Sequence, residues 1–444
     1  MEYHKRVTVT VLLLISSLYA GAQYATTNDS TLHLSLTEVW QKAVNANRSI
    51  ALSKKEVAIH AETQKDAVLQ RLPEVNITGS IEKLTNMPVY QDGILHAHQQ
   101  HDIIHTLYRT GADLYFNLYN GNKLNLRIEE EKLLYKTALI KEEETITDVR
   151  FRAAAAYLSL QQALLFKALL VNDIASHDEQ LTEIRENFKN GVVLKSDVLR
   201  AELDLSGKKM TLVQAENDIL IANQQLNILI GEKDEQVIQP EAVPDSPFII
   251  TGNYEQYLAI AMQHAFDLQL SEQETQLADI HLQQSRSLMR PSAGLYGSFY
   301  YSNPQVLLYP YNPFWSSLGI AGIKVKLPVS SLYHNTRKIK AARLEIEREE
   351  IRHKDTEDKI RQQVKEAWLH YREALLRIDV ARKNVDQAIE NERIIRNTYF
   401  NHTALITDLL NAGLLVLQSR FELTTAKITA QLKYHQLQHI TGTL

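Results

Sequence analysis

The sequence repeats itself. When it is aligned with itself at an offset of 218, three small or rigid residues coincide with identical ones: Ala43 with Ala261, Pro73 with Pro291, and Gly79 with Gly297. Farther along the offset is 211, and identical residues coincide again: Ala156 with Ala367, Leu158 with Leu369, Asp197 with Asp408, and Gly231 with Gly442. The change in offset predicts a loop region that is seven residues shorter in the second half. We therefore predict an internal duplication, with a first repeat over 23–232, a proline-containing linker over 233–252 and a second repeat over 253–444.

Each repeat is predicted to contain the same elements in the same order: a helix, two strands, a very long helix and a final helix. In the first repeat these are helix 36–72, strands 74–84 and 106–118, helix 122–190 and helix 196–230. In the second they are helix 254–290, strands 293–302 and 315–327, helix 333–400 and helix 407–440. Pro73 and Pro291 mark the ends of the first helices, because proline cannot continue a helix.

The long helices follow from the scarcity of helix breakers. Neither Gly nor Pro occurs between Gly121 and Gly191, and neither occurs between Pro328 and Gly413. A continuous helix over the first of these segments would be about 100 Å long. Alanine recurs every seven residues in the second long helix, at Ala367, Ala374, Ala381 and Ala388. This spacing predicts close, supercoiled packing against other helices, and by itself it also fits a soluble coiled coil.

The N-terminus is typical of an exported protein. Residues 1–22 combine basic Lys5 and Arg6, an apolar stretch over 7–18 and an Ala20-Gly21-Ala22 cleavage motif, so we predict a secretory signal peptide. The apolar stretch is short of the roughly 20 residues that a membrane-spanning helix needs. No later segment has 18 uncharged apolar residues in a row, so a helical membrane protein is not expected.

Composition excludes several classes of function. The chain has no cysteine, which excludes disulfides, thiolate metal sites and cysteine nucleophiles. Its 48 basic and 53 acidic residues give a net charge of −5, so we expect no nucleic-acid partner. No nucleophile elbow, P-loop or H-E-x-x-H motif occurs. We predict no catalysis and no cofactor.

The strand segments indicate a membrane. Residues 106–118, TLYRTGADLYFNL, alternate imperfectly and are rich in aromatic side chains, as are 295–301 and 315–327. Runs of about ten residues with aromatics near their ends are typical of transmembrane strands. Four strands cannot close a barrel, and lipid tolerates no unpaired strand edge. Several chains must then contribute to one barrel, and three would give twelve strands.

Four motifs carry a resemblance to a known family: LSLTEVWQKAVNANRSI, RLPEVNITGSI, YFNLYNGNKL and FKNGVVLKSDVLRAELDL. With them, nearly the whole mature chain resembles the TolC-like outer-membrane efflux proteins. The resemblance implies a mixed, mainly helical fold, in which a homotrimer forms a twelve-strand outer-membrane β-barrel continued by a twelve-helix periplasmic α-barrel. It implies the exit duct of a tripartite efflux pump, passive and coupled to an inner-membrane transporter through a periplasmic adaptor protein. Two alternatives are not excluded by the sequence: a duct for type I protein secretion, and a structural periplasmic coiled coil without a barrel.

The resemblance also implies which residues act. The turn between the last two helices of the first repeat would be a periplasmic tip that docks the adaptor, through Phe188, Gly191, Val192, Val193 and Leu194. Exposed apolar residues at a tip favour a partner surface. A plain helix end at Gly191 is the alternative, since glycine readily adopts positive φ there.

The matching tip of the second repeat would narrow the pore. Tyr399 matches a gate tyrosine, and Asp408 matches the first of two acidic rings, whereas Asn411 stands at the second. Asp197, the counterpart of Asp408, is assigned to the same constriction. An N-terminal helix cap is the alternative for Asp408. The family's latch is not expected here, because Ala404 and His402 replace its arginine and glycine.

A histidine cluster lies between the first two strands, at His96, His98, His101 and His105. Such a cluster can bind zinc or copper, which would make the protein a metal-efflux duct. An exterior polar loop without a metal is the reading that we prefer, because nothing in the sequence fixes the geometry of the rings.

Overall fold

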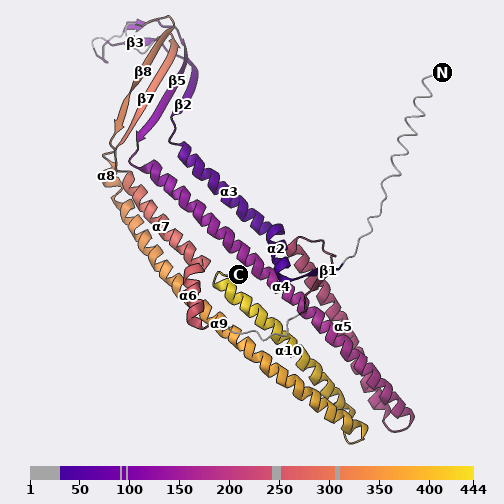
Figure 1. Ribbon diagram of the computed structural model, residues 1–444. Helices are drawn as coiled ribbons and strands as arrows, with labels where there is room; N and C mark the ends of the chain where they lie inside the picture. The colour runs from indigo at the N-terminus through magenta and orange to yellow at the C-terminus, as the bar shows by residue number, and fades with distance from the viewer. Residues whose placement is uncertain (1–30, 91–92, 97–98, 243–251, 306–310) are drawn as a thin grey trace, which may run out of the picture. The chain divides into compact units, whose positions relative to one another are not determined.

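The structure is a computed structural model that describes residues 31–90, 93–96, 99–242, 252–305 and 311–444. The predicted signal peptide and His98 lie outside these residues. The chain is mainly helical (Figure 1). It forms two compact units: the first comprises Met1–Ala43, Ala153–Ser246 and Gln387–Thr424, and the second comprises Val44–Arg152, Pro247–Asp386 and Thr425–Leu444. Each unit therefore combines segments of both repeats.

Both halves of the chain have the same order of main elements. The first half contains β1 (Leu32–Leu34), α2 (Leu36–Ala46), α3 (Arg48–Leu69), β2 (Glu74–Lys83), β3 (Met87–Val89), β4 (Gln99–His101), β5 (Thr106–Tyr119), α4 (Lys123–Lys189) and α5 (Lys195–Ile230). The second contains β6 (Ile238–Pro240), α6 (Tyr254–His264), α7 (Phe266–Ser287), β7 (Ser292–Asn303), β8 (Ser316–Lys326), α8 (Ser331–His334), α9 (Thr336–Phe400) and α10 (Ile406–Ile440).

The first helix of each repeat is interrupted, which corrects the prediction of continuous helices over 36–72 and 254–290. The backbone is extended at Asn47, whose side chain accepts a hydrogen bond from the Ser49 N–H and caps α3. Ala265 breaks the second helix with similar extended angles and without a side-chain cap. The two breaks coincide when the sequence is aligned with itself at the first offset of the repeat.

Two short strand pairs were not predicted from the sequence. β1 and β6 pair in parallel, so the segment expected to be a linker supplies a strand. Buried Tyr157 holds this pair in the first unit: its hydroxyl donates to the Leu34 carbonyl at 3.0 Å and accepts from the Glu241 N–H at 2.9 Å. In the second unit, β3 and β4 form a hairpin between β2 and β5.

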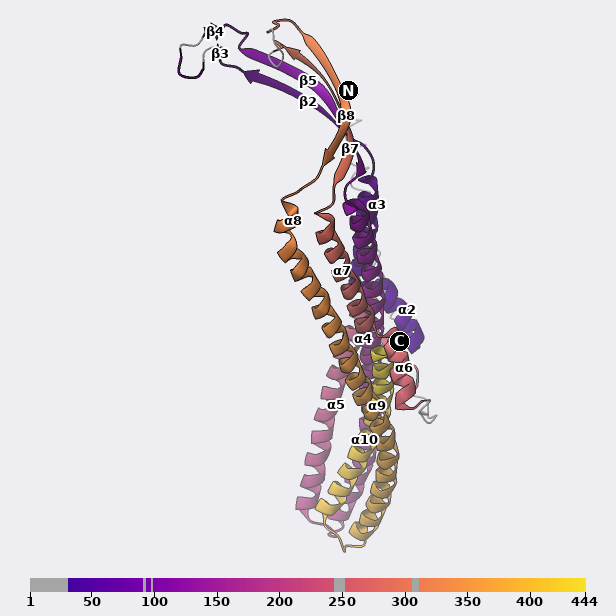
Figure 2. The same ribbon diagram turned by 90° about the vertical axis from the view of Figure 1, so that its left-hand side faces the viewer.

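The second unit contains a four-stranded antiparallel sheet in the order β2-β5-β7-β8 (Figures 1 and 2). The strands join α3, α4, α7 and α9 at one end of the sheet, with the single turn of α8 before α9. Within the described residues, β2 and β8 each have one edge without a strand partner. Backbone groups on these edges lack the pairing that a closed sheet would give.

The long helices bury narrow seams. The four heptad alanines of α9 are all buried, as the spacing requires for close helix packing. Among the described helices, only α4 contains a stretch long and apolar enough to cross a membrane. About a third of that stretch is buried, and Ala153, Ala154 and Leu158 of α4 are fully buried in the first unit.

Candidate functional site

The turn between α4 and α5 is the predicted adaptor-docking tip. α4 ends at Lys189, and Gly191 follows with φ 74°, in the left-handed region that favours glycine. Its N–H donates to the Phe188 carbonyl at 2.9 Å, and the Val192 N–H donates to the Asn187 carbonyl at 2.8 Å. These two bonds satisfy carbonyls at the helix end. The backbone of Gly191 thus ends the helix as a C-cap, which is the alternative considered in the sequence analysis.

The turn between α9 and α10 has the same backbone. His402 has φ 61°, its N–H donates to the Tyr399 carbonyl at 2.8 Å, and the Thr403 N–H donates to the Thr398 carbonyl at 2.9 Å. His402 is the counterpart of Gly191 at the second offset of the repeat. The two turns therefore share a left-handed residue, and at His402 the side chain disfavours this conformation.

The side chains of the two turns differ in exposure. Leu194 is 70% exposed, and Phe188 and Val192 are also exposed, whereas Val193 packs against a buried cluster. That cluster comprises Leu181, Ile184, Val198, Ala201, Leu205, Tyr399, Ile406 and Leu409. The predicted docking residues thus divide into an exposed set and one half-buried residue, Val193, that packs against the cluster.

Tyr399, the predicted gate residue, is itself part of this cluster. It is 4% exposed, and its hydroxyl has no hydrogen-bond partner among the described residues. Burial, with the carboxylates of Asp197 and Glu183 nearby, raises the pKa of Tyr399 to about 12. In this conformation the ring supports the packing of the helix ends.

The remaining constriction residues lie at the start of α10 and α5. Asp408 and Asn411 are exposed, and their spacing of three places them on one face of α10. An Asp408 carboxylate oxygen accepts from the Leu405 N–H at 3.1 Å, so Asp408 caps α10 from the third helical position and is not itself the N-cap residue. Asp197 is half-buried at the corresponding position of α5.

The sheet has two chemically different faces. The register places Val75, Leu114, Gly297 and Ala321 in one row, and Ile77, Ala112, Phe299 and Gly319 in the next. Leu295, Ile323 and Val325 continue this face, and from Val75 to Ile81 it carries no charged residue. Many of these side chains are exposed, with Ile77 at 84%.

The opposite face alternates with it and is polar. It presents charged residues at Glu74, Arg109, Asp113, Lys324 and Lys326. Aromatic side chains lie toward the ends of the sheet, where the rings of Tyr108 and Trp315 are 6.4 Å apart. An apolar exposed face opposite a polar one is the pattern of a transmembrane barrel strand.

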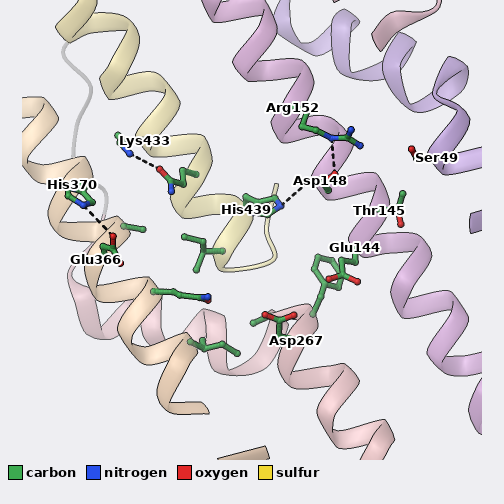
Figure 3. A pocket seen from close by; sticks show the side chains of 17 residues that line it. Ser49, Glu144, Thr145, Asp148, Arg152, Asp267, Glu366, His370, Lys433 and His439 are labelled. Carbon is green, nitrogen blue, oxygen red and sulfur yellow. Dashed lines mark hydrogen bonds and ion pairs between the residues drawn. The ribbon is translucent and has the colours of Figure 1, made fainter. Parts of the chain in front are cut away.

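A polar cavity of about 700 Å³ opens in the second unit, between α4, α7, α9 and α10 (Figure 3). Arg152 and Asp148 form an ion pair of 2.9 Å, and His439 lies 4.0 Å from Asp148. Burial raises the pKa of Glu144, with Asp267 adding to it. Sequence reasoning missed this cavity, because its lining comes from separate segments, although Glu144, Asp148 and Arg152 recur every four residues on α4.

The histidine cluster is only partly described. His96 is exposed, His101 lies in β4, and the His105 ring is hydrogen-bonded to Asn86 at 2.8 Å. The described residues include no group of three or more His, Asp or Glu side chains that could hold a metal ion. The predicted loop between the first two strands thus contains a hairpin whose histidines are not assembled into a site in the part described.

Solved structures with the same fold are outer-membrane proteins. CusC matches with 14% identity and a TM-score of 0.77, over 92% of each chain. VceC of Vibrio cholerae matches with 14% identity and a TM-score of 0.74, over 92% of this chain and 96% of that one. MtrE of Neisseria gonorrhoeae, an outer membrane channel, matches with 17% identity and a TM-score of 0.71, over 92% and 88%. At such identities the likeness establishes the fold, which is that of outer-membrane channels.

A family model matches part of the sequence. Residues 39–232 match the model of the outer membrane efflux protein family, whereas no curated protein sequence matches the chain. The match covers most of the predicted first repeat, and it agrees with the resemblance to TolC-like outer-membrane efflux proteins. The chain is thus similar to outer-membrane efflux proteins in the sequence of its first repeat and in its fold.

Proposed function

We propose that three copies of the chain assemble into one channel that serves as the passive exit duct of a tripartite efflux pump. Each copy contributes four strands to a twelve-strand barrel and four long helices to a periplasmic tunnel. An inner-membrane transporter supplies energy and selectivity, and a periplasmic adaptor connects it to the duct.

The two-faced sheet with two open edges carries this proposal. Its apolar face suits lipid, and its polar face suits a water-filled lumen. Neither edge of β2 or β8 can stay unpaired in hydrocarbon, since each unsatisfied backbone group there costs several kcal/mol. Pairing β8 of one copy with β2 of the next satisfies both edges, and three copies give a strand number within the known bacterial range.

Exposed heptad pairs support a shared helical tunnel. α5 exposes large apolar residues seven apart at Leu203 and Met210, and α9 does so at Leu369 and Leu376. Such pairs face the same side of a supercoiled helix and need a partner helix to leave water. The neighbouring copies would provide these helices.

The internal duplication doubles the symmetry of this assembly. Two observations support a duplication within the chain. The first helix of each repeat breaks at the corresponding position, Asn47 or Ala265, and the two tip turns have matching hydrogen bonds. A trimer would then be a six-fold pseudo-repeat. Asp408 and Asn411 would recur three times around the pore, and three like charges on a narrow ring attract cations.

The rival from another class is a structural periplasmic coiled coil. It would leave the apolar face of the sheet in water, at a cost of roughly 25 cal/mol for each Å². A duct for type I secretion or for metal export differs from the proposed function in cargo, and the same assembly would serve each of them.

Three measurements test the proposal: fractionation of the protein with the outer membrane in cells, the mass of the purified particle in detergent, and its migration in gels before and after heating. We expect three times the chain mass, outer-membrane fractionation and heat-dependent migration. A protein that stays monomeric in detergent while circular dichroism shows an intact β signal contradicts the proposal.

A further inference from the structure

Basic residues gather where the sheet joins the helices. They are Arg71 after α3, Lys123 at the start of α4, Arg290 after α7, and Arg337, Lys338, Lys340 and Arg343 at the start of α9. We call these seven residues the basic collar. The sequence around the five collar residues of the second half is depleted of acid, since residues 280–344 contain neither Asp nor Glu.

All seven side chains are exposed. The ion pairs of the described residues include none of them, whereas farther along α9 arginines pair with nearby glutamates, as Arg348 does with Glu345 and Glu349. Arg71 donates a hydrogen bond to the Asn125 side chain, which leaves its charge uncompensated. The collar is thus a concentration of positive charge without an internal counterion.

Exposed apolar side chains lie between the sheet and the collar. Leu327 and Val329 follow β8, and Leu332 and Tyr333 belong to α8. Leu72 has the corresponding place between α3 and β2. Apolar and aromatic side chains followed directly by Lys and Arg are typical of the level where a bilayer changes from hydrocarbon to headgroups.

The height of the collar fits a headgroup layer. From Thr336 to Arg343 the helix rises about 10 Å, at 1.5 Å per residue. Two headgroup layers share the difference between a hydrocarbon core of about 30 Å and a whole bilayer of about 40–45 Å, so each layer is roughly 5–8 Å thick and the collar is long enough to span one of them. The collar would therefore begin just beyond the apolar face and extend through the adjoining polar layer.

We propose that the basic collar binds anionic phospholipid headgroups on the periplasmic side of the membrane. The inference rests on the proposed function, because it requires the apolar face of the sheet to lie in the bilayer. Phosphate oxygens would accept hydrogen bonds from the arginine and lysine side chains, and the apolar residues above would contact the acyl chains. Binding would fix the depth of the channel in the membrane.

Native mass spectrometry of the full channel, released from nanodiscs of phosphatidylcholine and phosphatidylglycerol, tests the proposal. The collar variant is R337Q/K338Q/K340Q. The control variant K354Q/R382Q/K383Q removes the same number of exposed charges from the same helix. Each basic residue near an anionic surface contributes roughly a five-fold preference. We expect the wild type and control to retain phosphatidylglycerol above its bulk proportion, and the collar variant to lose at least five-fold of that enrichment.

Two results overturn the proposal: a wild type that retains both lipids in their bulk proportion, or a control that loses as much enrichment as the collar variant. The second result would mean that the enrichment of phosphatidylglycerol depends on the net charge of the protein and not on the collar. Particle mass and heat-dependent migration, measured on the same samples, separate this failure from that of the proposed function. A heat-modifiable trimer without lipid preference overturns the collar alone.

Discussion

The apolar face of the sheet makes a prediction that a water-facing sheet would not share. Ile77 is 84% exposed, and we expect Ile77→Arg to prevent stable insertion into the outer membrane. On an ordinary protein surface the same change would be nearly neutral or would improve solubility. The matched control is Thr78→Arg, the neighbouring position of β2, where the alternation of the strand turns an exposed side chain to the opposite face.

The size of the effect follows from the position of Ile77 in the strand. β2 runs from Glu74 to Lys83, and Ile77 is its fourth residue of ten. At about 3.3 Å per residue, its side chain is about 5 Å along the strand from the middle. Arginine near the midplane of a barrel costs about 2–4 kcal/mol. This corresponds to a roughly 30- to 700-fold shift in the insertion equilibrium for each copy.

The assay is the yield of heat-modifiable protein in the outer-membrane fraction, followed by its thermal unfolding in detergent. We expect Ile77→Arg to lower the yield strongly and Thr78→Arg to resemble the wild type. Equal yields and equal unfolding temperatures for the two variants would falsify the assignment of this face to lipid. A loss in Thr78→Arg alone would reverse the assignment of the two faces.

Three further predictions concern the tips and the helix ends. Leu194→Asp is expected to abolish capture of the periplasmic adaptor in a pull-down while the trimer stays intact, whereas Leu405→Asp on the other turn retains capture. His402→Gly is expected to raise the free energy of unfolding by about 1 kcal/mol, measured by urea titration, because it relieves a left-handed side chain. Burial lowers the pKa of His435 and His439 in the folded protein. As the pH falls below about 6.5, these side chains therefore bind protons more readily in the unfolded chain than in the folded protein. The unfolding temperature should therefore drop toward pH 5, and it should drop less in H435Q/H439Q.

Each of these predictions has a result that contradicts it. Loss of the trimer in Leu194→Asp would make that residue part of the core. A lower stability of His402→Gly would show that the imidazole contributes more than its backbone conformation costs, and Gly191→His is the reciprocal test. An identical pH dependence in the wild type and the histidine variant would assign acid sensitivity to other groups, among which Asp148 and Asp267 oppose the shift at His439.

Much of the fold could be predicted from the positions of Gly and Pro and from the periodicity of apolar residues. The absence of Gly and Pro over 122–190 predicts a single helix, and α4 runs over Lys123–Lys189. Predicted strand 74–84 corresponds to β2 at Glu74–Lys83. The break at Ala265 gave no such signal, since alanine is the best helix former. A tertiary contact lies at this break: Gly442, at φ 72°, brings its backbone against His264 so closely that a Cβ there would clash with the His264 carbonyl.

The candidate site was less accessible to sequence reasoning. A motif could place Tyr399 at a tip, but only packing shows that its side chain lies in a buried cluster with Leu181 and Ile406. Likewise, the sequence alone does not distinguish the apolar residues Val192, Val193 and Leu194. In the structure, Val193 packs against the cluster that contains Val198, whereas the other two are exposed. Exposure depends on residues that are distant in the sequence, which periodicity does not report.

The two tip turns show how one backbone can support two surfaces. Their hydrogen bonds are the same, but Val192 in the first turn corresponds to Thr403 in the second. The first turn kept the glycine that its left-handed backbone favours and has apolar side chains exposed for a partner. The second has His402 at that strained position. A backbone fixed by its carbonyl bonds leaves the side chains free to diverge. An adaptor that recognises apolar surface would find three tips that expose Phe188, Val192 and Leu194, alternating around the proposed trimer with three tips that expose Leu405.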